Sequence, residues 1–406
     1  MTVTDLYYDP YDYAIDADPY PAWKRLRDES PVYFNERHGF YALSRYDDVL
    51  NGLLDTDTYR SGHGIVLEMI ADEPYENIPM MIMKDPPEHT RLRKLVSRAF
   101  TPRRIADLER RIAKLCNDLF DTVDGQDEFD YIETFAGLLP PTVILALVGY
   151  PDGYAAEFRE RADSSLHIDD GDTMLRHGID RSLVSESGEI ANDAWAILPE
   201  LMEQRRADPQ DDLISGLVHA EIDDDGELRT LTLDEIAGFV QLISSAGTET
   251  VARLLGFAAV TLAKHPDQRQ LLIDEPSLVP NAIEELLRYE APSPIQSRWV
   301  SRDVELHGTV IPRGSRLALL NGSGDRDERH FEDPDRFDVR RVIDRHLAFG
   351  YGTHFCIGAA LARLEGTVGL TETLRRFPTW EIDERGLEWV HTSTVRGYSS
   401  VPVRVR

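Results

Sequence analysis

The chain has 406 residues, of which 42% are hydrophobic, and it carries a formal net charge of −29. This length allows a large buried core, and the acidity disfavours nonspecific binding to nucleic-acid phosphates. The first residues show no basic start followed by an apolar stretch, so no targeting peptide is expected. The most apolar stretch, residues 236–262, is interrupted by Glu249 and Arg253. We therefore expect a cytoplasmic protein with no membrane anchor and no nucleic-acid partner.

The predicted elements change character along the chain. Residues 20–28 are predicted to be helical, and residues 32–34 and 40–43 to be short strands. From residue 87 to about residue 287 the pattern is helical, with a long helix at about 233–264. Strand patterns return at residues 304–311, 317–320 and 401–405. Because no linker or repeat interrupts the chain, residues 1–406 are predicted to form a single, mainly α domain of the α+β class, with small β-sheets.

The two cysteines have different surroundings. Two cysteines argue against a disulfide framework and suit a reducing compartment. Cys116 lies in an amphipathic helical pattern and is predicted to be a core side chain. Cys356 follows a glycine-rich loop and precedes a helix, where backbone N–H groups and the helix dipole stabilise a thiolate. There is no second cysteine nearby and no His-Glu-x-x-His pattern, so a zinc site is disfavoured.

One segment of this acidic chain is basic. Residues 91–114 contain nine basic residues against two acidic ones. The basic residues are Arg91, Arg93, Lys94, Arg98, Arg103, Arg104, Arg110, Arg111 and Lys114. The pattern indicates either a docking face for an acidic partner or a solvated helix face.

Two helical patterns carry residues that an ordinary core helix would not need. Residues 246–250, AGTET, lie at the centre of the predicted long helix; Gly247 removes bulk, and threonine hydroxyls can bond where the helix ladder opens. A kink without chemistry is the alternative. Residues 85–93, DPPEHTRLR, predict a helix start, with His89 and Arg93 one turn apart on one face. Two cationic donors on one face suit a carboxylate.

The stretch FGYGTHFCIG, residues 349–358, resembles the haem-binding signature of the cytochrome P-450 family, Phe-Gly-x-Gly-x-His-x-Cys-x-Gly, at every specified position. Three further segments resemble the family in the expected order: residues 85–93, residues 246–250, and the Glu-x-x-Arg motif at Glu285 and Arg288. The resemblance implies a P-450 fold with haem b between the long central helix and the helix that follows Cys356.

The resemblance also implies roles for individual residues. Cys356 would be the proximal iron ligand, and Thr250 and Glu249 the alcohol and acid that deliver protons. Arg336 would complete the Glu285–Arg288 network. The other residues implied to contact the haem are His89, Arg93, Arg298 and His354 at its propionates, and Phe349, Gly350, Gly358 and Ala246. Relatives often have Asp at position 249 and Asn at position 325, where this chain has Glu and Asp.

The implied activity is a monooxygenase that inserts one oxygen atom from dioxygen into a lipophilic small molecule, by hydroxylation or epoxidation. The pocket is expected from residues 64–69, 80–83, 294–296 and 392–394 and the neighbourhood of Ala246. The chain has no flavin or nicotinamide fingerprint, so an acidic ferredoxin and its reductase are expected to supply electrons, with the ferredoxin docking on residues 91–114. A peroxide-driven peroxygenase and a non-catalytic haem sensor are the alternatives.

Overall fold

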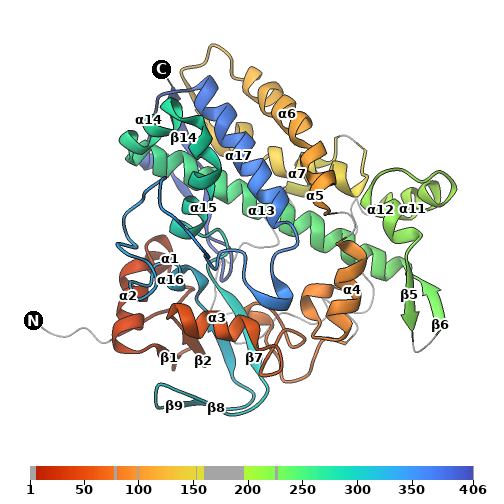
Figure 1. Ribbon diagram of the computed structural model, residues 1–406, viewed down its shortest axis with the longest axis vertical. Helices are drawn as coiled ribbons and strands as arrows, with labels where there is room; N and C mark the ends of the chain where they lie inside the picture. Colours follow the sequence, from red (N-terminus) through yellow and green to blue (C-terminus); the bar gives the residue numbers. More distant parts are fainter. Residues whose placement is uncertain are drawn as a thin grey trace, which may run out of the picture.

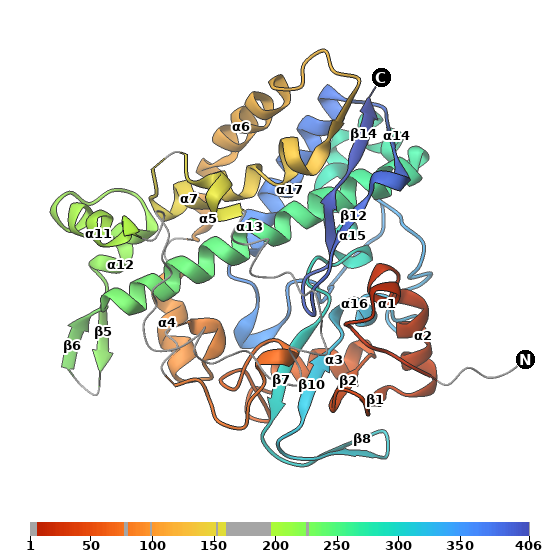
Figure 2. The ribbon, with the colours of Figure 1, turned by 180° about the vertical axis from the view of Figure 1, so that it is seen from behind.

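The computed structural model describes residues 6–76, 80–97, 100–151, 153–159, 196–224 and 227–405. Helix α13 (Leu233–Lys264) runs through the middle of the molecule (Figures 1 and 2). It begins with a capping box, in which Thr232 Oγ1 accepts from the Glu235 N–H and the Glu235 carboxylate accepts from the Thr232 N–H. Every residue from 251 to 262 is buried, as expected for a helix enclosed by others.

The helices around α13 form the larger core. Helices α7 (Leu139–Val148), α15 (Val279–Tyr289) and α17 (Ala359–Arg376) pack against it, and α6 (Glu109–Asp121) packs against α17. The remaining described α-helices are α1 (Tyr13–Ala17), α2 (Tyr20–Glu29), α3 (Tyr46–Leu54), α4 (Glu88–Val96), α5 (Pro102–Asp107), α11 (Leu198–Ala207), α12 (Leu213–Val218), α14 (Pro266–Asp274) and α16 (Asn321–Gly324).

The main sheet lies on the other side of α13 from α6 and α17 (Figure 2). Its strand order is β1 (Val32–Asn35), β2 (Phe40–Leu43), β10 (Arg316–Leu319), β7 (Gln296–Val300) and β3 (Tyr59–Arg60). Strand β10 pairs in parallel with β2, and the other pairs are antiparallel. The smaller sheets are β11 (Trp380–Ile382) with β14 (Pro402–Val405) and β4 (Glu128–Asp130), β12 (Glu388–Val390) with β13 (Gly397–Ser400), β5 (Glu221–Asp224) with β6 (Glu227–Thr230), and β8 (Val304–Leu306) with β9 (Thr309–Ile311).

The predicted mainly α architecture with small sheets is confirmed, and so is the buried core position of Cys116, which is 0% exposed. Some elements are different. Strands β4, β5 and β6 lie within residues 87–287, where the pattern was helical. Residues 304–311 were expected to be one strand, but they form the β8–β9 hairpin. The chain reverses at His307 and Gly308, with φ values of 50° and 77°. Glycine accepts this left-handed backbone readily, so the His-Gly pair makes a tight turn between the strands.

Candidate active site

A large cavity lies between the middle of α13 and the loop that carries Cys356. The space between its lining residues, together with the part that is open to solvent, measures about 1250 Å³. Most of its wall is apolar. The apolar lining residues are Met81, Ile82, Phe100, Ile144, Leu242, Ile243, Ala246, Val251, Leu254, Leu287, Pro292, Ala348, Phe349, Phe355, Ile357, Leu361 and Ala362. The lining therefore suits a large ligand with an apolar surface.

Cys356 is held at the cavity wall by its own loop. The loop turns through Gly350 and Gly352, whose φ values are 64° and 70°, and the Cys356 N–H donates to the Phe349 carbonyl at 2.9 Å. Burial raises the pKa of the Cys356 thiol, whereas the backbone N–H of Gly358 and the charge of Arg93 lower it. A sulfur atom with backbone donors and a nearby guanidinium can act as an anionic ligand.

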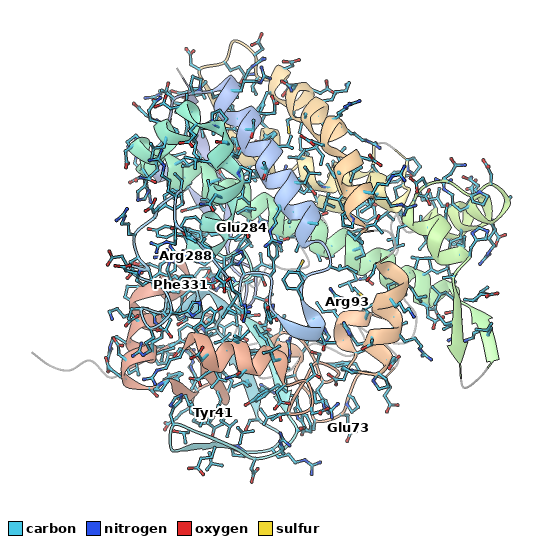
Figure 3. All side chains as sticks on the ribbon, in the orientation of Figure 1. Tyr41, Glu73, Arg93, Glu284, Arg288 and Phe331 are labelled. Atoms are coloured by element: carbon cyan, nitrogen blue, oxygen red, sulfur yellow. The ribbon has the colours of Figure 1, made fainter. Side chains whose placement is uncertain are left out.

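Glu284 of α15 ties together the two sides of this loop. Its carboxylate bonds to His346 Nε2 at 3.2 Å on one side and receives two hydrogen bonds from Arg363 on the other, at 2.7 and 2.9 Å. Burial raises the pKa of Glu284, but these partners outweigh it and bring it to about 2. The Arg363 guanidinium also lies 4.6 Å from the centre of the Phe349 ring, on the loop itself. Figure 3 labels Glu284 one turn from Arg288 on α15.

Four cationic or N–H donor groups gather near the Cys356 loop without a carboxylate partner among the described residues. Arg93, labelled in Figure 3, donates to the Phe355 carbonyl at 2.5 Å. The rings of His89 and His354 lie 4.1 Å apart, and each ring has a buried nitrogen with no hydrogen-bond partner. Burial lowers the pKa of His89 to about 4, that of His354 to about 2 and that of Arg298 to about 10.

The structure brings most of the predicted site residues to one cavity. Cys356, His89, Arg93, His354, Phe349, Gly358, Ala246 and Thr250 all line it. Gly350 and Arg298 lie just outside the lining, and Gln296 connects them to it. The Gln296 side-chain nitrogen would lie 2.9 Å from a Cβ at position 350. The Gln296 side-chain oxygen accepts a hydrogen bond from the Arg298 guanidinium at 3.3 Å.

Thr250 and Glu249 occupy different environments on α13. The Thr250 hydroxyl faces the cavity and donates to the Ala246 carbonyl one turn earlier, at 3.0 Å. Glu249 is 2% exposed and is absent from the cavity wall; its carboxylate pairs with Arg253 at 2.5 Å. The alcohol is therefore in place at the cavity, whereas the acid is held by another residue of the same helix.

The Glu-x-x-Arg motif forms the expected buried pair, but its third member is different. Glu285 and Arg288 are each 0% exposed and share two hydrogen bonds of 2.6 and 2.9 Å. The expectation for Arg336 is wrong: its side chain points outward to Asp338, and only its backbone carbonyl joins the network. The guanidinium that reaches Glu285 is that of Arg341, at 3.1 Å.

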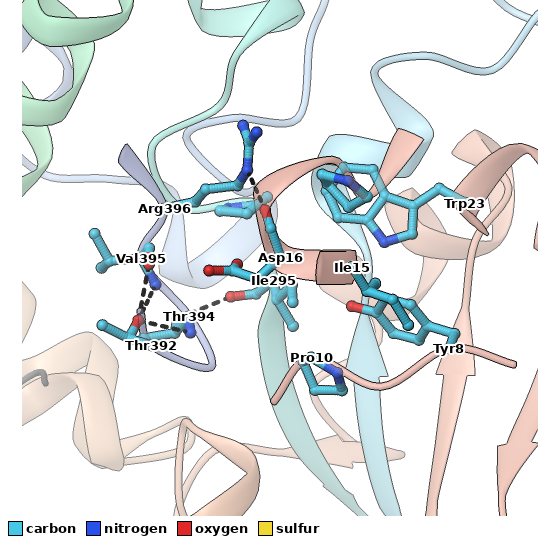
Figure 4. A pocket seen from close by; sticks show the side chains of 12 residues that line it. Tyr8, Pro10, Ile15, Asp16, Trp23, Ile295, Thr392, Thr394, Val395 and Arg396 are labelled. Atoms are coloured by element: carbon cyan, nitrogen blue, oxygen red, sulfur yellow. Dashed lines mark hydrogen bonds between the residues drawn. The ribbon is translucent and has the colours of Figure 1, made fainter. Parts of the chain in front are cut away.

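The expected pocket segments are only partly at the cavity. Met81, Ile82 and Gln296 line it, but residues 64–69 and 392–394 do not. Leu67 is instead packed in the core beside the main sheet, and Ser393 donates to Glu68 at 2.8 Å. Thr392 and Thr394 line a separate, smaller pocket with the N-terminal segment (Figure 4).

Sequence reasoning missed two polar residues of the cavity. Ser293 lines it directly after Pro292. Glu365 of α17 also lines it, is 1% exposed, and has a buried carboxyl oxygen without a partner; burial raises its pKa well above the usual range. The sequence contained a signal for Glu365, because it lies one turn after Leu361 on the same helix face.

Comparison with known proteins identifies the family. The family model for cytochrome P450 matches residues 175–394. A putative cytochrome P450 123 from Mycobacterium tuberculosis is 40% identical over 405 residues, covering 99% of this chain and 98% of that protein. The 6-deoxyerythronolide B hydroxylase of Saccharopolyspora erythraea is 35% identical, covering 100% and 99%. The crystal structure of CYP109E1 from Bacillus megaterium with testosterone superposes with a TM-score of 0.84, at 29% identity and 96% and 98% coverage.

The chain belongs to the cytochrome P450 family. It is a haem-dependent monooxygenase, and members of this family bind haem b through a cysteine thiolate. The residues present fit that cofactor: a cysteine faces the cavity, and four donor groups near it lack the carboxylates that two propionates would supply. Within the described residues, no helix is both long and apolar enough to cross a membrane.

Proposed function

We propose that Cys356 is the thiolate ligand of the haem iron. The observation that carries this proposal is the position of its sulfur, which faces the same cavity as Ala246 and Thr250 of the central helix. The loop geometry supports it as well, because the Gly358 N–H and Arg93 favour the anionic sulfur. A thiolate donates electron density to the iron, and the bound haem supplies the activation of dioxygen.

The propionates would be held by His89, Arg93, Arg298 and His354. Buried donors without partners are costly, so a carboxylate that accepts from them contributes to binding. The two unpartnered histidine nitrogens, His89 Nδ1 and His354 Nε2, support this assignment. Phe349, Gly350, Gly358 and Ala246 would contact the rest of the ring.

Thr250 and Glu249 would serve proton delivery. The Thr250 hydroxyl, at the cavity wall, can turn from the Ala246 carbonyl to hold a proton or a water molecule at the reacting centre. Glu249 is the adjacent acid. The apolar wall around them excludes bulk water and limits proton supply to these groups.

The substrate would be a lipophilic small molecule, hydroxylated at a C–H bond or epoxidised at an alkene. The apolar lining supports this class, and Met81 adds a flexible side chain that adapts to irregular shapes. The relative from Saccharopolyspora erythraea is named a hydroxylase. Ser293 offers one hydroxyl group to a polar substituent of the substrate.

Electrons would come from an acidic ferredoxin and its reductase. The basic segment occupies α4, α5 and α6, and α5 and α6 pack on α17, the helix that follows Cys356. Arg91, Lys94, Arg103, Arg110, Arg111 and Lys114 are exposed there. Arg98 lies outside the described residues. Arg104 already pairs with Asp211 and Lys114 with Asp118, so part of the face is neutralised.

Charge reversal tests the docking face. Because opposite charges speed association mainly at low salt, the Arg103→Glu/Arg110→Glu double variant should be reduced more slowly by an acidic ferredoxin, with the difference shrinking as salt is added. Arg313→Glu makes the same kind of charge change at an exposed residue between β9 and β10, outside the basic segment. Equal reduction rates for the double variant and Arg313→Glu would contradict the proposed face.

The haem ligand is tested by the absorption spectrum of the dithionite-reduced protein under carbon monoxide. Thiolate ligation red-shifts the Soret band, and this shift should be present in the wild type and lost in Cys356→Ala. Cys116→Ala, which removes the buried cysteine outside the cavity, is the matched control and should keep the shift. A shift that survives Cys356→Ala would contradict the assignment.

A further inference from the structure

Glu249 and Arg253, two residues of the central helix α13, form a buried ion pair. Both residues are 2% exposed, and they stand one turn apart on α13, so their side chains meet along one face at 2.5 Å. Thr250, the next residue after Glu249, faces the cavity. The ion pair therefore lies on the same turn of α13 as a residue of the cavity wall.

Strand β13 holds the arginine of this pair. Arg253 Nη1 donates to the Tyr398 carbonyl at 2.6 Å, while Nη2 donates to Glu249. The strand approaches closely because residue 397 is glycine: a Cβ there would lie 2.7 Å from Arg253 Cβ. The guanidinium is thus fixed at two points, on its own helix and on the C-terminal hairpin.

The described elements that pack against α13 differ in the charged side chains that they carry. Helices α7 and α12 contain no titratable side chain, and β13 contributes Tyr398, whose pKa is raised by burial. On α15, Glu285 and Arg288 are paired with each other. On α17, burial raises the pKa of Glu365 well above the usual range, which favours its uncharged form. Among the described residues, Arg253 is the positive charge whose contact with the Glu249 carboxylate the structure records, at 2.5 Å.

A carboxyl group as buried as Glu249 needs a partner to remain charged. Without a counter-charge, a buried acid takes up a proton and keeps it, and it can no longer pass protons on. A relay group must do both: the Glu249 carboxylate would take up a proton and release it toward the Thr250 hydroxyl, which would give its own proton to the cavity. The Glu249–Arg253 pair carries the same net charge before the proton arrives and after it has left.

We propose that Arg253 is a positioning residue for proton delivery, which keeps Glu249 ionised and oriented and is itself held by strand β13. This proposal rests on the proposed role of Glu249 and Thr250. It adds that Glu249 and Arg253 act as one unit, so that the loss of either slows the same step.

The test compares Glu249→Gln, Arg253→Met, Arg253→Lys and the Glu249→Gln/Arg253→Met double variant. The haem-loaded proteins are supplied with NADH, a saturating acidic ferredoxin and its reductase, and NADH consumption under air is measured in ordinary and heavy water. Arg269→Met is the matched control, because Arg269 is a buried arginine that donates to a strand carbonyl, that of Trp380, at 2.9 Å, and it is outside the cavity wall.

We expect Glu249→Gln and Arg253→Met each to slow consumption by about 10²-fold, the lower range for a lost acid–base group, with a larger solvent isotope effect. The double variant should be no slower than either single variant. Arg253→Lys should recover most of the rate, and Arg269→Met should match the wild type. Arg253→Met at the wild-type rate would overturn the proposal. If Arg253→Met does not fold, Arg253→Gln, which still donates but carries no charge, replaces it.

A second readout needs no turnover. Infrared difference spectra of the protein without haem should show a new protonated-carboxyl band in Arg253→Met, which disappears in the double variant. The absence of that band would show that Arg253 does not keep Glu249 ionised, and would overturn the proposal. If the band behaves as expected but Glu249→Gln consumes NADH normally, the proton-delivery role of Glu249 fails and the proposal fails with it, while the ion pair itself is upheld.

Discussion

Replacing Asp325 with asparagine should stabilise the protein above neutral pH. Asp325 is 0% exposed; Oδ1 accepts from the Leu347 N–H at 2.7 Å, and Oδ2 is buried without a partner. Burial raises the pKa of this carboxyl from 3.8 to about 7, against the opposing effect of His346 and Arg288. At about 1.4 kcal/mol per pKa unit, this shift of about three units corresponds to roughly 4 kcal/mol.

The sign of the effect follows from the raised pKa. In the folded protein the carboxyl binds its proton more tightly than in the unfolded chain, so its contribution to stability is fully present below about pH 4. It is lost as pH rises through about 7. Asparagine keeps the acceptor for the Leu347 N–H and carries no charge. The variant should therefore equal the wild type at acid pH and exceed it by up to about 4 kcal/mol at pH 8.

Urea unfolding of both proteins across this pH range measures the difference. Asp327→Asn is the control, since Asp327 is as buried but its carboxylate accepts from the Tyr46 N–H at 2.9 Å and pairs with Arg329 at 3.1 Å. This control should lose stability near neutral pH. A difference between Asp325→Asn and the wild type that is the same at pH 5 and pH 8 would refute the reasoning.

Three further changes probe the helical core. Glu365→Met removes an unpartnered buried carboxyl and should stabilise by about 1–3 kcal/mol, increasingly as pH rises, because burial raises the pKa of Glu365; equal melting temperatures at pH 6 and 9 would contradict this. Glu285→Ala leaves Arg288 buried and unpaired and should cost about 3–5 kcal/mol in urea unfolding. Gly149→Ala should cost more than Gly153→Ala, since both have positive φ but only Gly149 is packed against a neighbouring carboxylate; equal losses would show no steric clash.

Local signals in the sequence were sufficient for much of the fold and for the position of the cavity. The long helix was predictable because its apolar residues form one contiguous run, interrupted by few charges. The neighbourhood of Cys356 was predictable because its glycines and the helix start lie within a few residues. The role of Arg341 was not predictable from the sequence, because Arg336 and Arg341 lie five residues apart and look alike there. The fold of the loop at residues 332–341 determines which of the two guanidinium groups reaches Glu285. The orientation of Glu249 depends on a partner one turn away and on a strand more than 140 residues later.

The bridge from Glu284 to both His346 and Arg363 has a consequence for the precision with which Cys356 is placed. The segment between these two residues contains the whole Cys356 loop, and one carboxylate of α15 holds it from both sides. A loop that is restrained at both ends has fewer conformations open to it. The position of the cysteine sulfur is therefore set by a rigid helix of the core as well as by the glycine turns of the loop itself.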